Sequence, residues 1–354
     1  MFGRAIDQLL PFPCDPKLEE TYVKDARMYL ELAESQVQPP VAFRYPWGEA
    51  LQKIDEMCPD VRIINLETSI TNSQDFWPGK EVTYRMSPEN AQALREAKID
   101  CVCLANNHVL DFGYKGLEET LETLKKLGIQ YAGAGFTLDE VQKPAFLPLG
   151  EETRVLIFSV GFPSSGVPKI WGFHGLGGVF FLKDYSESNV QFLRTKINQY
   201  KTERDTVILS IHWGSNWDYT VYPDEQGFAH RLIDEGVVDI IFGHSSHHAK
   251  GIEVYRDKLI LYGCGDLIND YEGIGGHDYF RGNVGALYFP TIDSENGRLL
   301  SLRITPTYIK DFKINLAGSQ ERKWLQETLN REGHKLGTKL VMEGKDFLLQ
   351  WKKS

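Results

Sequence analysis

This chain of 354 residues carries 49 acidic and 39 basic residues, a net charge of −10, and has no basic run that could follow a nucleic-acid backbone. No nucleic-acid partner is therefore expected. The five cysteines form no Cys-x-x-Cys pair, and their odd number argues against a complete disulfide framework, so we expect a reducing, cytoplasmic setting. No apolar stretch approaches the ~20 residues of a membrane span, and the first residues lack a signal-peptide pattern.

Strand and helix patterns alternate along the chain, which predicts an α/β fold built on a doubly wound sheet. In chain order, helices are predicted at residues 15–34, 48–57, 88–97, 113–127, 188–200, 225–235, 319–331 and 339–351. Strands are predicted at residues 61–67, 101–105, 154–160, 206–211, 237–242, 252–255, 259–262, 284–289 and 299–308, with a hairpin between the sixth and the seventh.

The domain organisation follows from length and from the absence of any repeat, low-complexity tract or obvious linker. We expect one domain over residues 1–315, followed by a charged helical tail over residues 316–354. Residues 161–180 are rich in glycine, proline and serine but also contain aromatic residues, and we expect an ordered loop there, near the strand ends.

Three apolar runs, at residues 102–108, 207–214 and 240–248, each contain histidine at or just after their end. Each run has the pattern of a buried parallel strand, and in open α/β sheets ligands bind at the carboxyl ends of such strands. Five of the nine histidines directly follow predicted strands: His108, His212, His244, His247 and His248. Several imidazoles at one sheet edge indicate a metal site.

The first of these motifs combines Asn107, His108 and Asp111. An amide oxygen is a hard neutral ligand for a divalent cation, and an imidazole can donate a proton to a leaving group. Asp111 could accept the other ring N–H of His108 and fix its tautomer. Equally, Asn106 and Asn107 could form a turn, with His108 as a capping residue and Asp111 as the N-cap of the following helix.

The other motifs add imidazoles and a carboxylate. His244 and His247 lie within one tight turn, close enough to share a site, although both could be solvated loop residues. His212 stands alone and could be structural, but Trp213 and the aromatic residues after it suggest a pocket wall. Glu67 ends another strand, and a carboxylate there could bridge two cations, whose repulsion requires anionic ligands. It could also be an exposed acid.

Together these segments resemble the capsule synthesis protein CapA (poly-γ-glutamate biosynthesis) family of the calcineurin-like metallophosphoesterase superfamily. The resemblance covers about residues 1–270 and is carried by residues 65–67, 105–108 with Asp111 and Gly113, 131–135, 212–214, 243–247 and 251–255. It implies an α/β fold of the layered calcineurin-like type, with central mixed β-sheets flanked by helices.

The resemblance also implies roles for individual residues. The site would hold two divalent metal ions, of Mn, Fe or Zn. Their ligands would be Glu67, Asn107, His212, His244 and His247. The catalytic residues would be His108, which protonates the leaving group or holds the attacked oxyanion, and Asp111. Substrate-binding residues would be Tyr84, Arg85, Asn106, Trp213 and Asp266. Arg85 is as readily a surface salt-bridge partner.

Two departures from the family pattern stand out. The family's first strand ends in a Gly-Asp pair whose Asp ligates metal, and residues 1–4 here match the run just after that pair. Where the family commonly has Gly-Asn-Phe after the hairpin, this chain has residues 265–267, Gly-Asp-Leu. Without the first Asp, we expect one of two metal sites to be weakened.

These features favour a metal-dependent hydrolase that uses a metal-activated water on an anionic small-molecule or polymer substrate, a phosphoester or an amide such as polyglutamate. One alternative is a non-catalytic component of poly-γ-glutamate synthesis or export. Another is a truncated, inactive form. The sequence does not determine the oligomeric state.

Overall fold

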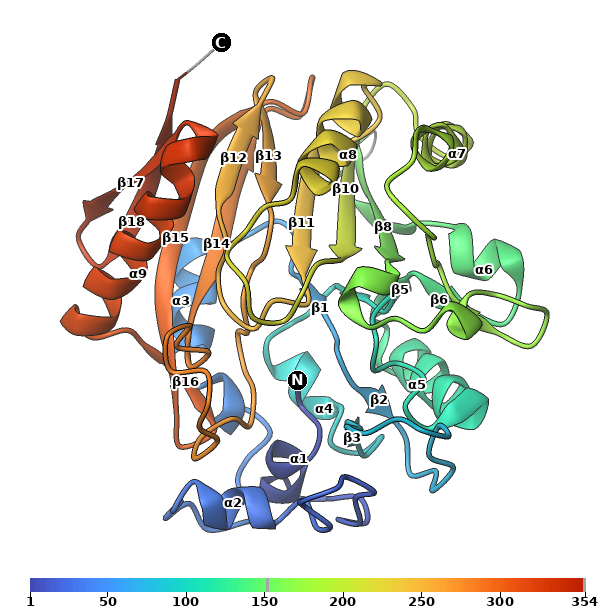
Figure 1. Cartoon of the computed structure of the whole chain (residues 1–354), viewed down its shortest axis with the longest axis vertical. Helices are drawn as coiled ribbons and strands as arrows, with labels where there is room; N and C mark the ends of the chain where they lie inside the picture. The colour runs from blue at the N-terminus through green and yellow to red at the C-terminus, as the bar shows by residue number, and fades with distance from the viewer. Residues whose placement is uncertain (151–152, 353–354) are drawn as a thin grey trace.

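The structure is a computed structural model that describes residues 1–150 and 153–352. It is a mixed α/β fold, as predicted, but its strands do not form one doubly wound sheet (Figure 1). Most of them form a small parallel sheet, a larger mostly parallel sheet and an antiparallel sheet, and the other four form two two-stranded sheets, β2-β3 and β6-β9. A buried apolar strand has the same sequence pattern in one sheet or in two, so the pattern could not separate these arrangements.

The small sheet has the order β1-β4-β5, with all strands parallel, and comprises β1 (Ile63–Asn65), β4 (Cys101–Cys103) and β5 (Gln130–Ala132). Helix α5 (Gly113–Leu127) connects β4 to β5 and matches its predicted bounds. Its stripe of leucines is buried. The prediction of a glycine cap is confirmed, because Gly128 follows the helix with φ of 70°.

The larger sheet has the order β12-β13-β11-β10-β8-β7. Its strands are β7 (Ala145–Pro148), β8 (Arg154–Gly161), β10 (Asp205–His212), β11 (Ile240–His244), β12 (Ile252–Tyr255) and β13 (Lys258–Leu261). The four inner strands are parallel, and the two edge strands are antiparallel to their neighbours. The predicted hairpin is thus present as β12 and β13. The parallel strands β8, β10 and β11 end near the middle of the molecule (Figure 1).

These two sheets share one apolar core. Cys101 and Cys103 of β4 belong to the same buried cluster as Ile157 of β8 and Ile208 of β10. The outer face of the larger sheet packs against α7 (Glu187–Asn198) and α8 (Pro223–Asp234), and that of the small sheet packs against α5. The result is a helix, sheet, sheet, helix layering that brings β4 and β8 together where they end.

The antiparallel sheet corrects the prediction for the end of the chain. It contains β14 (Val284–Ile292), β15 (Leu299–Lys310), β16 (Lys313–Leu316), β17 (Thr338–Glu343) and β18 (Asp346–Trp351). The predicted helix over 319–331 is present as α9 (Ser319–Gly333), but the one over 339–351 is wrong. Exposed and buried residues alternate at Lys339, Leu340 and Val341, and a two-residue turn with φ of 64° at Gly344 joins the strands.

The remaining elements are short. They are α1 (Ala5–Leu9), α2 (Met28–Leu32), α3 (Ala50–Met57), α4 (Gln92–Glu96), α6 (Leu138–Gln142), β2 (Ser69–Ile70), β3 (Arg85–Met86), β6 (Ala134–Gly135) and β9 (Gly178–Val179). The helix predicted at 15–34 is reduced to α2, because a bridge between Lys17 and Asp25 closes the preceding residues into a loop. Residues 161–180 contain two 3₁₀ turns and β9. Among the described residues, no helix is long and apolar enough to cross a membrane.

Candidate functional site

Residues from four strand ends of the two parallel sheets meet in one buried cluster. Glu67 follows β1, Asn107 follows β4, and His212 and His244 are the last residues of β10 and β11. His212 lies directly opposite His244 in the parallel register. The two sheets meet next to this cluster: the backbone amide of Ala105, just after β4, donates to the hydroxyl of Ser159 on β8 at 3.2 Å. This contact brings the strand ends of both sheets together.

His212 and His244 face each other through their Nδ1 atoms, which are 2.6 Å apart. The Nε2 atom of His244 lies 2.6 Å from the Ser210 hydroxyl. Burial lowers the pKa of His244 to about 3 and that of His212 well below its ordinary value, so both rings are neutral at pH 7. One ring therefore donates its N–H to the other. The neutral imidazole is also the form that binds metal ions.

Asn107 and Glu67 lie beside the other nitrogen of His212. The Asn107 Oδ1 atom is 3.0 Å from His212 Nε2, and Glu67 Oε1 is 3.8 Å from it. Burial raises the pKa of Glu67 to about 7, and the Asn65 amide donates to this carboxyl at 2.8 Å. The Asn106 side-chain amide in turn donates to the Asn65 side-chain oxygen at 3.0 Å. Asn106 was predicted to bind substrate, and in the structure its amide instead fixes the end of β1.

His108 and Asp111 form a buried pair. The ring Nδ1 atom is 2.7 Å from Asp111 Oδ2, and the Tyr84 amide donates to the same oxygen at 2.7 Å. Burial lowers the pKa of His108 and raises that of Asp111 to about 7. A neutral His108 donates through Nδ1, which leaves Nε2 free to exchange a proton. Asp111 is not the N-cap of α5, since Phe112 occupies that position.

His247 reaches the cluster from the turn after β11. Its Nδ1 atom is 3.0 Å from Asp266 Oδ2, and its Nε2 atom is 3.3 Å from the Tyr271 hydroxyl. Two effects on the pKa of His247 oppose each other: burial lowers it, and the nearby Asp266 carboxylate raises it. The raising effects win, so the pKa of His247 lies above the ordinary value. Asp266, predicted to bind substrate, thus contacts a histidine of the cluster. His248 points elsewhere and stacks on Phe280 at 4.6 Å.

The other predicted substrate residues divide into one beside the cluster and two away from it. The Tyr84 ring meets the His108 ring edge-on at 4.8 Å. Arg85 is buried, donates to the carbonyl oxygens of Asp15 and Ser73 and forms no salt bridge with another described residue, so it is not a surface salt-bridge partner. Its contact with a substrate stays a prediction. Trp213 is buried in the core and donates its indole N–H to a backbone carbonyl at 2.9 Å, so its substrate contact stays a prediction.

Two residues beside the cluster were not singled out from the sequence. The Lys80 ammonium lies 3.6 Å from Asp111 Oδ1, and Tyr271 contacts His247. Both belong to irregular segments with no periodicity, so no sequence signal marks them. Trp217, from the predicted aromatic wall, does approach the site, with its ring 5.2 Å from that of His247.

The donor atoms of the cluster fit a divalent ion by type, since two neutral imidazoles, an amide oxygen and a carboxylate suit Mn, Fe or Zn. Within residues 1–150 and 153–352, however, no group of three or more His, Cys, Asp or Glu side chains is arranged to hold an ion. The Nδ1 atoms of His212 and His244 are at hydrogen-bonding distance and would have to separate to admit one.

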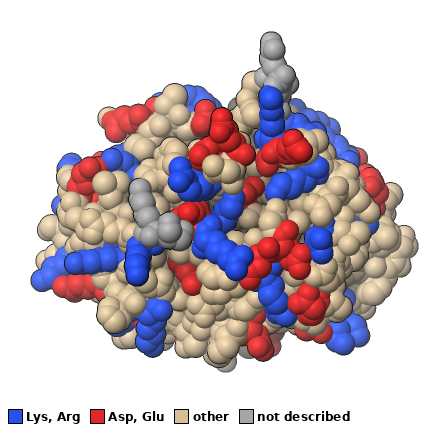
Figure 2. All heavy atoms as spheres, turned by 90° about the horizontal axis from the view of Figure 1, so that it is seen from above, with Lys and Arg blue, Asp and Glu red and all other residues tan. Residues whose placement is uncertain are grey.

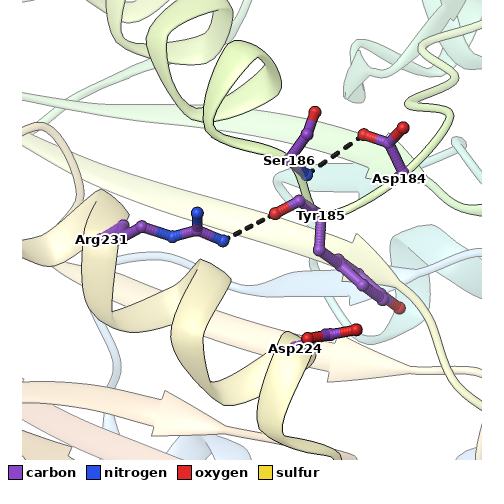
Figure 3. A pocket seen from close by; sticks show the side chains of 5 residues that line it. All are labelled: Asp184, Tyr185, Ser186, Asp224 and Arg231. Carbon is purple, nitrogen blue, oxygen red and sulfur yellow. Dashed lines mark hydrogen bonds between the residues drawn. The ribbon is translucent and has the colours of Figure 1, made fainter.

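The surface adds little to this site. A hollow of about 370 Å³ lies at the start of α7 and α8, and none of the predicted site residues lines it; its walls are Asp184, Tyr185, Ser186, Asp224 and Arg231 (Figure 3). On the face seen from above, basic and acidic side chains alternate over the described surface, and neither sign forms a continuous expanse there (Figure 2).

Comparison with known proteins adds an independent line of evidence. The family described as "Bacterial capsule synthesis protein PGA_cap" matches residues 1–271. A probable polyglutamine synthesis accessory protein of Mycobacterium tuberculosis (strain CDC 1551 / Oshkosh) is 42% identical over 98% of this chain and 93% of its own length. The capsule biosynthesis protein CapA of Bacillus anthracis is 27% identical over 54% of this chain and 45% of its own length. The PGA biosynthesis protein CapA of Bacillus subtilis (strain 168) is 26% identical over 58% and 52%, respectively.

Proposed function

Because the chain belongs to the bacterial capsule synthesis protein PGA_cap family, we propose that it is a metal-dependent hydrolase acting on an anionic glutamate polymer. Its fold would be of the layered calcineurin-like metallophosphoesterase type. The observation that carries the proposal is the convergence of Glu67, Asn107, His212 and His244 at four strand ends, with the His108–Asp111 pair beside them.

The residues that would hold the metal are these four together with His247. A bound divalent ion would supply a water of lowered pKa and a Lewis acid for the attacked carbonyl. The protein's own contribution is orientation: Asn65 holds the Glu67 carboxyl, Ser210 holds the His244 ring, and Asp266 holds the His247 ring.

His108 is the residue placed to move a proton. Its Nδ1–H is donated to Asp111, so Nε2 is the atom that can exchange a proton with the leaving nitrogen of an amide. Asp111 is itself fixed by the Tyr84 amide, which limits rotation of the pair. An amide of glutamate is the bond class that we favour, because the motifs resemble those of a poly-γ-glutamate biosynthesis family; relatives of the chain are named as polyglutamine and PGA synthesis proteins.

The test is to load the purified protein with Mn²⁺, Fe²⁺ or Zn²⁺, measure bound metal, and follow cleavage of a γ-glutamyl oligomer and of p-nitrophenyl phosphate. We expect stoichiometric metal and cleavage of the oligomer, both lost in His212→Asn. His230→Gln is the matched control, because His230 lies outside the cluster and stacks on Tyr255. A protein without metal, or a His212→Asn variant that cleaves normally, would contradict the proposal.

A second candidate is a non-catalytic accessory component of polymer synthesis. It is favoured by one observation: both ring nitrogens of His212 and of His244 already have protein partners, so the pair is satisfied without an ion. The two candidates separate in a strain that lacks the gene and makes no polymer. Restoration of polymer by both the wild-type protein and His212→Asn favours the accessory role, whereas restoration by the wild type alone favours catalysis.

A further inference from the structure

The side chains of the histidine cluster are closed off from solvent. Glu67 is 7% exposed, His247 is 5% exposed and His212 is fully buried. A ligand can reach such a cluster only if part of the covering structure moves. The covering residue beside His247 is Trp217, and the centres of these two rings lie 5.2 Å apart. Because Trp217 is itself half-buried, it lies at the boundary between the cluster and the solvent.

The Trp217 ring is covered in turn by His277. The two rings are stacked, with their centres 4.1 Å apart and an angle of 7° between their planes. His277 is exposed and lies in the long loop between β13 and β14. We call residues 274–279, with the sequence Ile-Gly-Gly-His-Asp-Tyr, the central loop. The stack therefore joins an exposed loop residue to the tryptophan that contacts the cluster.

The residues on either side of the central loop are held firmly by the rest of the protein. Before it, the Glu272 carboxylate accepts hydrogen bonds from the backbone amides of Asp311 at 2.8 Å and Phe312 at 2.6 Å. After it, the Phe280 ring stacks on the buried His248 ring at 4.6 Å. These contacts fix the two points from which the central loop projects.

The central loop itself has few contacts with the rest of the protein. Among the described residues, its hydrogen bonds are all to residues 271–281. Its ring contacts outside that range are the His277 stack and an edge contact between Tyr279 and Tyr219 at 5.7 Å. Tyr279 is nevertheless 66% exposed. A segment with so few buried contacts has a low free energy of local opening.

Glycines give the central loop the freedom to move. Gly276 has φ of +103°, and no described atom beyond the adjacent residues lies within 4 Å of where a Cβ atom on Gly275 or Gly276 would be. Gly273, at the base of the loop, has φ of +81° and packs directly on the Leu32 carbonyl. Because glycine tolerates large changes in φ and ψ, these three residues are suited to act as hinges.

We propose that the central loop is a lid over the histidine cluster, held closed by the His277–Trp217 stack. Separation of the two rings opens the lid, exposes Trp217 and, behind it, His247, and so admits a ligand. The lid controls access alone, and it therefore operates in the same way whether or not the ligand that enters is hydrolysed. Its opening is a local event, because the residues on both sides of the central loop remain in place.

The test is the rate at which diethyl pyrocarbonate modifies each histidine, measured by peptide mass spectrometry at low conversion and fixed pH. The full chain is used without added metal. Since the reagent reaches a buried imidazole only while it is transiently exposed, the rate at His247 follows the population of the open lid. In the wild type, His247 should react much more slowly than the exposed His334. His277→Ala should raise the His247 rate by about fivefold, because the stack is lost.

His277→Phe keeps an aromatic ring at this position and should react as the wild type does. His174→Ala, in a different exposed loop, is the matched control and should leave the His247 rate unchanged. An unchanged His247 rate in His277→Ala, or the same rise in His277→Phe, would overturn the assignment. So would a wild-type His247 that reacts as fast as His334. An equal rise at His230 in His277→Ala would also overturn it, since the whole fold, and not a lid, would then have loosened.

Discussion

The Nδ1 atoms of His212 and His244 lie 2.6 Å apart, although 32 residues separate the two histidines in the chain. The parallel pairing of β10 with β11 places them opposite each other at the carboxyl ends of both strands. Because both rings are neutral, a single proton lies between them, and the partner of one ring determines the tautomer of the other. The pair is therefore a single unit, and residues that contact either ring act on both.

Ser210 offers a test of this coupling, since its hydroxyl lies 2.6 Å from His244 Nε2. Ser210→Ala should reduce metal affinity by about tenfold or more, because the ring orientation and tautomer of His244 are no longer fixed. Metal titration by calorimetry measures the effect. Ser188→Ala, at an exposed position on α7, is the control. Equal affinities of Ser210→Ala and wild type would show that the two rings are not coupled in this way.

Asp266 gives a second prediction, on His247. Asp266→Asn keeps a hydrogen-bond acceptor but removes the charge that raises the pKa of His247, so this pKa should fall. Proton NMR of the imidazole in the metal-free protein follows the titration. Asp218→Asn is a suitable control, because the Asp218 carboxylate accepts hydrogen bonds from Thr220 and Tyr222 and from no histidine among the described residues. If the pKa of His247 is unchanged in Asp266→Asn, groups other than Asp266 raise it.

A third prediction concerns pH and the buried carboxyl of Glu67. Burial raises its pKa from 4.5 to about 7, so between these values the native state binds more protons than the unfolded state. Stability from this group is complete below about pH 4.5 and is lost as the pH rises to about 7. Relative to Glu67→Gln, metal-free wild type should lose on the order of 3 kcal/mol across this range.

Urea denaturation at several pH values between about 4.5 and about 8 measures this difference. The comparison with Glu67→Gln is needed because the buried histidines, with lowered pKa values, have the opposite pH dependence. Glu122→Gln, on the exposed face of α5, should show the same slope as wild type. A wild-type curve parallel to that of Glu67→Gln would mean that the carboxyl is not protonated in the native protein.

The strand ends of the cluster could be predicted because each follows a strong local pattern. A short apolar run followed by a polar motif marks a buried strand end, and this located β4, β10 and β11 near their observed positions. The hydrogen bond from His108 to Asp111 also has a local basis, since three residues separate them. These parts of the site depend on neighbouring residues in the chain.

Other parts depend on tertiary packing and have no local signal. Lys80 approaches Asp111 only because its loop folds back on the start of α5, and Tyr271 meets His247 from a loop after β13. Charged residues in 339–351 resemble a solvated helix, whereas Phe347 is fully buried against the antiparallel sheet. The division of strands between two sheets is likewise determined by packing, since each strand alone is equally compatible with both arrangements.

Gly133, where β5 ends, gives a last prediction, on the joint between the two parallel sheets. Its φ is +91°, and a Cβ atom there would lie 2.7 Å from Ser159 Cβ on β8 and 2.8 Å from Ala105 Cβ after β4. Gly133→Ala should therefore lower the free energy of unfolding by about 3 to 4 kcal/mol, from overpacking and left-handed backbone strain combined. Gly128→Ala is the matched control: its φ is +70°, no atom lies within 4 Å of the added methyl, and a loss of about 1 kcal/mol is expected. Urea denaturation of both variants measures the difference, and equal losses would show that the two sheets do not meet as tightly at this joint as the structure indicates.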